Sequence, residues 1–187
     1  PEVDNPSAVD RFEAVTGEHV AVGQSERVRL TDLMQEYLQT VSTRLEFGNI
    51  VDVCRRYGAG VASLPVERFY IWSDGESSDY DDDVILEFKE SRDPTPLDGL
   101  PLPFARDFAS NPERITHAQR LLQAEDTLDP TLGYAGPFAV KRKHGFQKGL
   151  SAERVRRKVT ERTWFASDLV DLANTSGRLL AASHVRG

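Results

Sequence analysis

The chain has 187 residues, of which 39% are hydrophobic and 28% are charged. This composition is that of an ordinary globular protein, and it excludes an intrinsically disordered chain. The net charge of −7 argues against a general affinity for nucleic acids or for anionic membranes. The length suits one domain with a proper hydrophobic core.

Cysteine usage and apolar patterning bear on the cellular compartment. The single cysteine, Cys54, excludes an internal disulfide and fits a reducing cytoplasm, where we expect the protein to reside. No apolar run approaches the roughly 20 residues that a membrane-spanning helix needs, and no signal-peptide pattern opens the chain. Because the sequence starts at Pro1 and stops just after a predicted helix, we expect a fragment of a longer protein.

Residues 1–28 contain prolines and glycines without steady periodicity and are predicted to form an irregular lead-in. A single α+β domain is predicted over residues 29–187. It begins with a helix, because apolar residues recur at steps of three and four from Leu30 to Leu45 before Gly48 and Asn49 end the pattern.

Three strands are predicted next, at Ile50–Tyr57, Glu67–Ser73 and Val84–Glu90. Strands this close in sequence favour an antiparallel meander. The acidic segment Glu76–Asp83, with Asp79, Asp81, Asp82 and Asp83, lacks the glycine and the distal glutamate of an EF-hand loop. We therefore interpret it as a solvated hairpin tip rather than a calcium site.

The second half alternates helices with one strand. A helix is predicted to start with Asn111 as N-cap, Pro112 in its first turn and Glu113 near the positive end of its dipole. The further expectations are its apolar face (Ile115, Ala118, Leu121, Leu122), a strand at Pro137–Arg142, a basic helix capped by Ser151, and a last helix capped by Ser167 with Leu169, Val170, Leu172, Ala173, Leu179 and Leu180 inward. The predicted fold is a small antiparallel sheet packed with helices.

Lys89 lies on a predicted strand, about thirty residues after a turn that contains Gly58 and Gly60. Protein kinases hold nucleotide phosphates with such a turn and such a lysine, the backbone N–H groups covering the phosphates and the ammonium supplying charge. Both features are common in proteins of other kinds. On spacing alone, a hairpin turn and a solvated lysine explain the pattern better.

Other functional motifs are absent from the sequence, including a Walker phosphate loop, a zincin motif, a nucleophile elbow and a zinc-type cysteine spacing. The four histidines are spread too widely for a local metal site. His117 is predicted to be a surface or packing residue, and His144 lies in a basic stretch from Lys141 to Lys158 that we interpret as a solvated loop and helix.

Five blocks of the sequence together carry a resemblance to a known family: Ile50–Gly60, Leu86–Glu90, Ala118–Ala124, Phe146–Gly149 and Gly177–Gly187. In order and spacing they resemble one bacterial family, the "domain of unknown function 2252" proteins. The resemblance covers about Val28 to Gly187.

The resemblance implies a kinase-like fold. Upstream of the matched region the family carries a Gly-Asp-x-His-x-x-Asn-like loop and an Asp-rich turn, which are similar to the catalytic loop and metal-binding aspartate of aminoglycoside-phosphotransferase-like kinases. The family would then be a circularly permuted kinase, and this chain its nucleotide-binding half. The implied cofactors are ATP and Mg²⁺ in the parent protein, and the implied partner is the missing upstream half, without which the chain is not expected to catalyse.

The same resemblance assigns residues to the nucleotide. Gly58 and Gly60 would form the phosphate-covering turn, and Lys89 would contact the phosphates. Ser63 stands where the family has a third glycine, and Pro65 stiffens the segment, so the cover is expected to be altered. A helix carboxylate normally holds the lysine, and the candidates are Glu113 and Glu125. Gln119 and Arg120 belong to a family block but receive no role.

Two other functions remain open, and with them whether the parent is an enzyme at all. One is a non-catalytic binding or regulatory module, in which Lys89 and the basic stretch 141–158 engage an acidic partner. The other is an ATP-dependent ligase, since ligases also place lysines on sheet strands. The kinase hypothesis requires ATP binding that depends on Lys89, whereas the binding module requires none.

Overall fold

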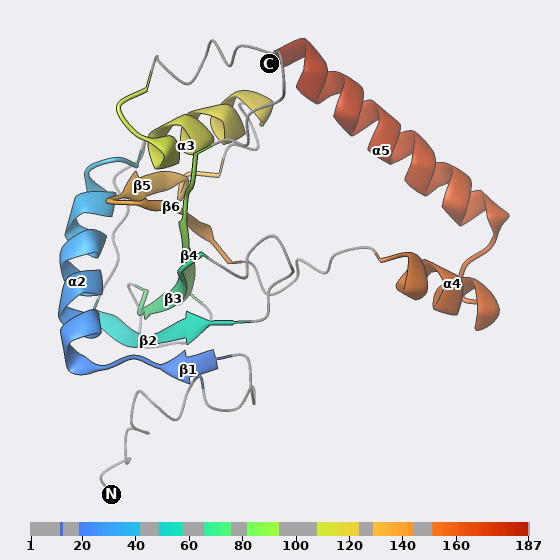
Figure 1. Ribbon diagram of the computed structural model, residues 1–187. Helices are drawn as coiled ribbons and strands as arrows, with labels where there is room; N and C mark the ends of the chain where they lie inside the picture. The colour runs from blue at the N-terminus through green and yellow to red at the C-terminus, as the bar shows by residue number, and fades with distance from the viewer. Residues whose placement is uncertain are drawn as a thin grey trace, which may run out of the picture.

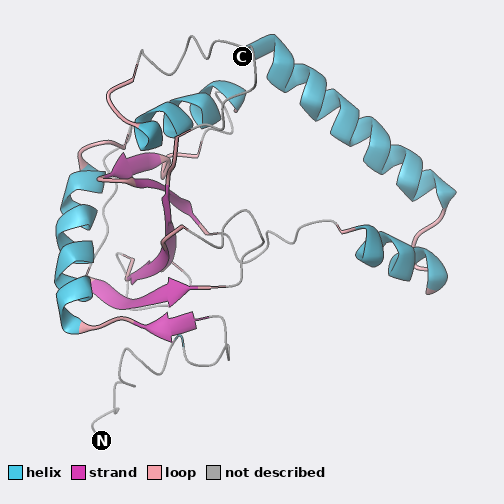
Figure 2. Ribbon diagram, in the orientation of Figure 1, coloured by secondary structure: helices cyan, strands magenta, loops and turns pink. Residues whose placement is uncertain are grey.

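The computed structural model describes residues 12, 19–41, 49–57, 66–75, 82–93, 108–123, 129–143 and 151–186. The elements are β1 (His19–Ala21), α2 (Gln24–Leu38), β2 (Ile50–Arg56), β3 (Arg68–Ser73), β4 (Val84–Glu90), α3 (Asn111–Leu122), β5 (Gly133–Ala135), β6 (Phe138–Arg142), α4 (Ala152–Thr160) and α5 (Ala166–Arg186). The fold is α+β, as the sequence predicted, with helices around one sheet (Figures 1 and 2).

The six strands form one antiparallel sheet in the order β1-β2-β3-β4-β6-β5. The predicted meander is β2-β3-β4, in which each strand pairs with the next along the chain. Helix α3 then connects β4 to a short hairpin, whose second strand, β6, pairs with β4 and leaves β5 at the sheet edge. Gly136 in the hairpin turn has φ +48°, a conformation that favours glycine.

The N-terminal prediction is wrong in part. Strand β1 and the first turn of α2 lie within residues 1–28, which were expected to be irregular. The first buried residue of α2 is Leu30. The residues of α2 before Leu30 therefore show no apolar periodicity in the sequence. Its N-cap, Gly23, supplies no side-chain cap. The usual sequence signals for a helix start are therefore missing.

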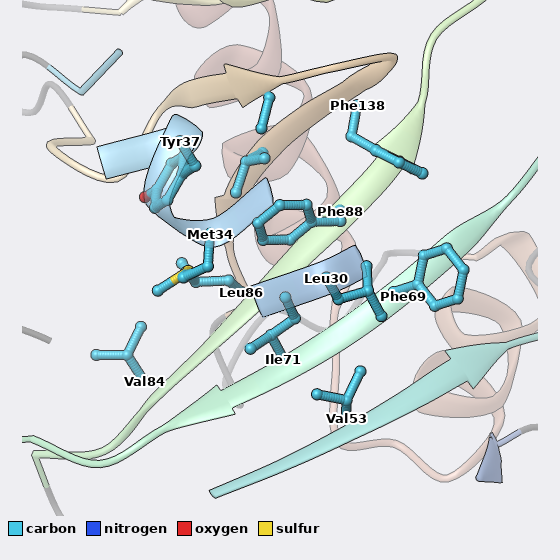
Figure 3. Packing of buried hydrophobic residues seen from close by; sticks show 12 residues of the cluster. Leu30, Met34, Tyr37, Val53, Phe69, Ile71, Val84, Leu86, Phe88 and Phe138 are labelled. Carbon is cyan, nitrogen blue, oxygen red and sulfur yellow. The ribbon is translucent and has the colours of Figure 1, made fainter. Parts of the chain in front are cut away.

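Helix α2 covers one face of the sheet and builds the core there. Its buried residues Leu30, Met34 and Tyr37 follow the i, i+4, i+7 spacing of one helix face. They pack against strand residues that include Val53, Phe69, Ile71, Val84, Leu86, Phe88, Phe138 and Val140 (Figure 3). The Tyr37 hydroxyl also donates a hydrogen bond to the Thr131 carbonyl at 2.8 Å, which ties α2 to the segment before β5.

Helix α3 is anchored by different residues from those predicted. Its N-cap is Ser110 rather than Asn111, because the Ser110 hydroxyl accepts from the Glu113 N–H at 3.3 Å. The predicted apolar face is wrong at its C-terminal end, since Leu121 and Leu122 are each 47% exposed. The buried residues are Pro112 and Thr116.

Helices α4 and α5 stand away from the sheet, and the C-terminal end of α5 comes back near α3 (Figure 1). Ser151 caps α4 as predicted, accepting from the Arg154 N–H at 3.1 Å. Helix α5 begins at Ala166, so Ser167 lies inside it and is not the cap. Val170, Leu179 and Leu180 were expected inward but are more than half exposed.

The described helices include none that is long and apolar enough to span a bilayer. Such a span needs about 20 apolar residues. Helix α5 reaches 21 residues, but polar and charged residues interrupt its sequence throughout.

Leu30→Ala is expected to destabilise the fold by about 2–5 kcal/mol, because it leaves a cavity between α2 and the sheet. The matched control is Val28→Ala on the same helix, where Val28 is 52% exposed and the loss should stay below about 0.5 kcal/mol. Urea unfolding followed by circular dichroism measures both. Equal losses in the two variants would contradict the placement of the core.

Candidate functional site

The sheet has a second face, opposite α2, that is lined by polar residues. Side chains alternate between the two faces of a strand, so the residues between the core positions point away from α2. Cys54, Tyr70, Glu87 and Lys141 are direct neighbours across β2, β3, β4 and β6. We call this surface the polar face.

Lys89 lies on the polar face, two residues after Glu87 on β4. It pairs with Arg68 on β3 and with Ala139 on β6, and its side chain is exposed. Arg68 begins β3, so Lys89 lies at the end of the sheet where the chain enters from the connection between β2 and β3. The predicted strand lysine therefore lies near the described end of that connection, at Val66.

A cavity of about 410 Å³ opens beside Lys89. Its wall is formed by β4 and β6 on one side and by α3 on the other, with Val66 at the end of the β2–β3 connection. Its lining includes Glu87, Lys89, Ile115, Gln119, Ala139 and Lys141. The cavity has the size of a small-molecule site.

The charges on the polar face are arranged around one buried carboxylate. Glu87 is 6% exposed, and it forms ion pairs with Arg68 at 3.4 Å and with Lys141 at 3.7 Å. Lys89 lies directly opposite Arg68, and like charges in such a pair repel. Two cations therefore pair with Glu87, and the third, Lys89, lies on the same face two residues further along β4, which favours an anionic ligand at the lysine.

Two further carboxylates at the cavity rim have partners of their own. The Glu90 carboxylate accepts from the Glu67 N–H at 2.7 Å and lies 4.0 Å from the Arg92 guanidinium. The Asp93 carboxylate accepts from the Asn111 side-chain amide at 2.7 Å. These contacts hold the chain that leaves β4 against its neighbours.

Glu113 and Gln119, both on α3, occupy different places relative to Lys89. The Glu113 carboxylate accepts from the Ala109 N–H at 2.9 Å and so closes a capping arrangement at the start of the helix. Gln119 lines the cavity with Lys89. Among the residues that the structure describes, no carboxylate forms an ion pair with Lys89. Glu125, the other predicted partner, lies outside the described residues.

The predicted phosphate-covering residues Gly58, Gly60 and Ser63 also lie outside the described residues. The two ends of their connection are described. Arg55 at the end of β2 contacts Glu67, just before β3, at 3.0 Å, and Glu67 also pairs with Arg29 of α2 at 3.2 Å. The same Arg55 contacts Glu26 of α2. Ion pairs to α2 thus hold both ends of the connection.

Arg120, which received no role from the sequence, fixes how α3 is rotated. Its guanidinium donates to the Thr40 carbonyl at 3.1 Å and to the Leu132 carbonyl at 2.5 Å. One turn earlier, the Thr116 hydroxyl donates to the Gly133 carbonyl at 2.9 Å. These bonds turn the neighbouring helix face, with Ile115 and Gln119, toward the cavity. In the sequence, the signal that pointed to Gln119 and Arg120 was their place in the family block Ala118–Ala124.

The acidic segment is described only at its end. Asp83 accepts hydrogen bonds from the Trp72 indole at 2.6 Å and from the Gly75 N–H at 3.2 Å, so it has a structural use. Within the described ranges, no group of three potential metal-binding side chains comes together. Asp79 and Asp81 lie outside those ranges.

Cys54 and His117 are packing residues. Burial, followed by the charge of Asp52, raises the pKa of the Cys54 thiol to about 12, so the thiol stays protonated at neutral pH and is a poor nucleophile. His117 is exposed on α3 and its ring lies 5.2 Å from that of Phe108, in agreement with the predicted surface or packing role. His144 is outside the described residues.

Glu87→Gln is expected to lower the free energy of unfolding by about 1–3 kcal/mol, because the largely buried Arg68 loses its charged partner. Lys141→Gln is the matched control: Lys141 belongs to the same ion-pair group, but its side chain is 46% exposed, and the loss should be below about 1 kcal/mol. Chemical denaturation at neutral pH measures both. A larger loss for Lys141→Gln would show that Glu87 does not organise the polar face.

Comparison with known proteins identifies the family. Residues 3–187 match the family described as "Uncharacterized protein conserved in bacteria (DUF2252)", and the match extends upstream of the range 28–187 that the sequence blocks covered. Neither the curated proteins nor the solved structures gave a match. Because the family match spans nearly the whole chain, the protein belongs to the bacterial DUF2252 family.

Proposed function

We propose that this chain is the nucleotide-binding half of an ATP-dependent phosphotransferase in the bacterial cytoplasm. The observation that carries the proposal is the position of Lys89. It lies on the third strand of the β2-β3-β4 meander, at the cavity, and the next element in the chain is helix α3. Protein kinases place their phosphate-binding lysine on the third strand and follow it with a helix that orients it.

The position of the β2–β3 connection supports the same proposal. In kinases a glycine-rich connection covers the phosphates that the lysine contacts. Here the connection that contains Gly58 and Gly60 ends at Glu67, next to Arg68, and Arg68 lies opposite Lys89. Ser63 and Pro65 replace the more flexible residues expected in such a cover, so the backbone N–H contacts to phosphate would be fewer than in a typical kinase.

The chemistry proposed for this half is binding and charge neutralisation. Lys89, with Arg68 and Lys141 nearby, would offset the negative charge of a triphosphate, and Mg²⁺ would enter with the nucleotide. The catalytic aspartates and the acceptor site would come from another part of the parent protein, which is the partner that we propose. The chain by itself would bind nucleotide without transferring phosphate.

Lys89→Ala is expected to weaken MgATP binding by about tenfold or more, because it removes a charged contact to phosphate worth about 1.5–3 kcal/mol. The matched control is Lys158→Ala, which removes a lysine from α4, outside the cavity, and should leave the affinity unchanged. Calorimetric titration with and without Mg²⁺ measures both. If wild-type protein does not bind ATP, or if both lysine variants bind as wild type does, the proposal fails.

A second candidate function is a non-catalytic module that binds an acidic partner. The observation that favours it is helix α4, which presents Arg154, Arg156, Arg157 and Lys158 and has no buried residue. An apolar groove of about 480 Å³, which includes Trp164 and Phe165, adjoins this helix. A basic helix beside an apolar groove is typical of a surface that binds an acidic amphipathic segment.

The double variant Arg156→Glu, Arg157→Glu is expected to abolish binding of an acidic amphipathic peptide if this second function holds, because it reverses the exposed charge of α4. Arg178→Glu, on the exposed part of α5, is the control and should retain binding. Fluorescence anisotropy at low and high salt measures the effect, since screening weakens contacts between exposed charges. Equal binding by the two variants would rule out α4 as the docking surface.

A further inference from the structure

We propose that Gln119, rather than a helix carboxylate, is the residue that positions Lys89 for nucleotide. The inference rests on the proposed function and names a feature of the same cavity that the kinase comparison does not supply. In kinases a glutamate on the helix after the lysine strand forms an ion pair with the lysine. Here an uncharged amide takes that place.

Glu113 already has a partner for its carboxylate at the start of α3. Its carboxylate accepts from the Ala109 N–H at 2.9 Å, and its own N–H donates to the Ser110 hydroxyl at 3.3 Å. Gln119 lies six residues further along α3, which is about 9 Å along a helix axis. Gln119 lines the cavity and Glu113 does not, because the Glu113 carboxylate is used at the start of the helix.

The packing of α3 fixes the orientation of Gln119. Thr116 and Arg120 bind backbone carbonyls at the β5 edge of the sheet. Ile115 and Gln119 are four residues apart and therefore share one helix face. That face lines the cavity together with Lys89. The half-buried Gln119 is thus held in the wall of the cavity that Lys89 also lines.

A glutamine side chain has one carbonyl oxygen that accepts and one NH₂ group that donates twice, whereas an ionised glutamate only accepts. The Gln119 oxygen would accept from the Lys89 ammonium, and its NH₂ group would donate to a phosphate oxygen of the nucleotide. Because the polar face already contains the buried Glu87, a neutral partner leaves the positive charge of Lys89 available for phosphate.

The test compares Gln119→Leu with Gln119→Glu in calorimetric MgATP titrations of the 187-residue chain. Leucine keeps the approximate volume but cannot hydrogen-bond, whereas glutamate keeps an acceptor for Lys89. We expect leucine to weaken binding about tenfold, in line with a lost hydrogen bond to a charged group, and glutamate to weaken it about threefold or less. A side chain that only fills space would give the opposite order, which would overturn the inference.

A double-variant cycle with Lys89→Ala separates positioning from folding. In the Lys89→Ala background, Gln119→Leu is expected to cause no further loss, because two residues that act as one unit are not additive. His117→Ala, on the exposed side of α3, is the control and should bind as wild type does. If the losses of MgATP binding in the two single variants simply add in the double variant, the role of Gln119 is overturned and the proposed function still stands. Absence of MgATP binding by the wild-type chain would overturn both.

Discussion

The packing of α2 against one face of the sheet is the contact on which the rest of the structure depends. Leu30, Met34 and Tyr37 cover the apolar side chains of β2, β3, β4 and β6, and together they form the described core. Tyr37 also reaches the β5 edge, where its ring lies so close to Gly133 that a Cβ there would come within 2.7 Å of it. Since the apolar residues are used on this face, polar and charged residues are left for the other.

The polar face becomes a site only because α3 closes one side of it. A sheet surface that bears Glu87, Lys89 and Lys141 would otherwise be an exposed charged surface, and such surfaces are common in proteins. Hydrogen bonds from Thr116 and Arg120 to backbone carbonyls hold α3 at the β5 edge. The ion pairs of Arg55 and Glu67 hold the two described ends of the β2–β3 connection. The cavity beside Lys89 is lined by β4, β6 and α3, and its size is that of a small-molecule site.

Elements with a strong local pattern were predicted well, and those without one were missed. Val84–Glu90 was predicted with the bounds that β4 has, because β-branched and aromatic residues mark buried strands. The three-residue strands β1 and β5 were missed because they are too short to show a period and owe their pairing to longer neighbours. Val170, Leu179 and Leu180 of the inward face expected for α5 are exposed, since an apolar stripe shows that a helix can pack but not what it packs against.

The sequence by itself determined the α+β class, the β2-β3-β4 meander and the position of Lys89 on a strand, because these follow from local periodicity and from turn chemistry. The alternation of β4 also places Lys89 and Glu87 on the same face. Only the tertiary structure decided that Gln119, and not Glu113, lines the cavity with Lys89. The rotation of α3 is set by Arg120 binding Thr40 and Leu132, and contacts between residues so distant in the chain leave no local pattern in the sequence.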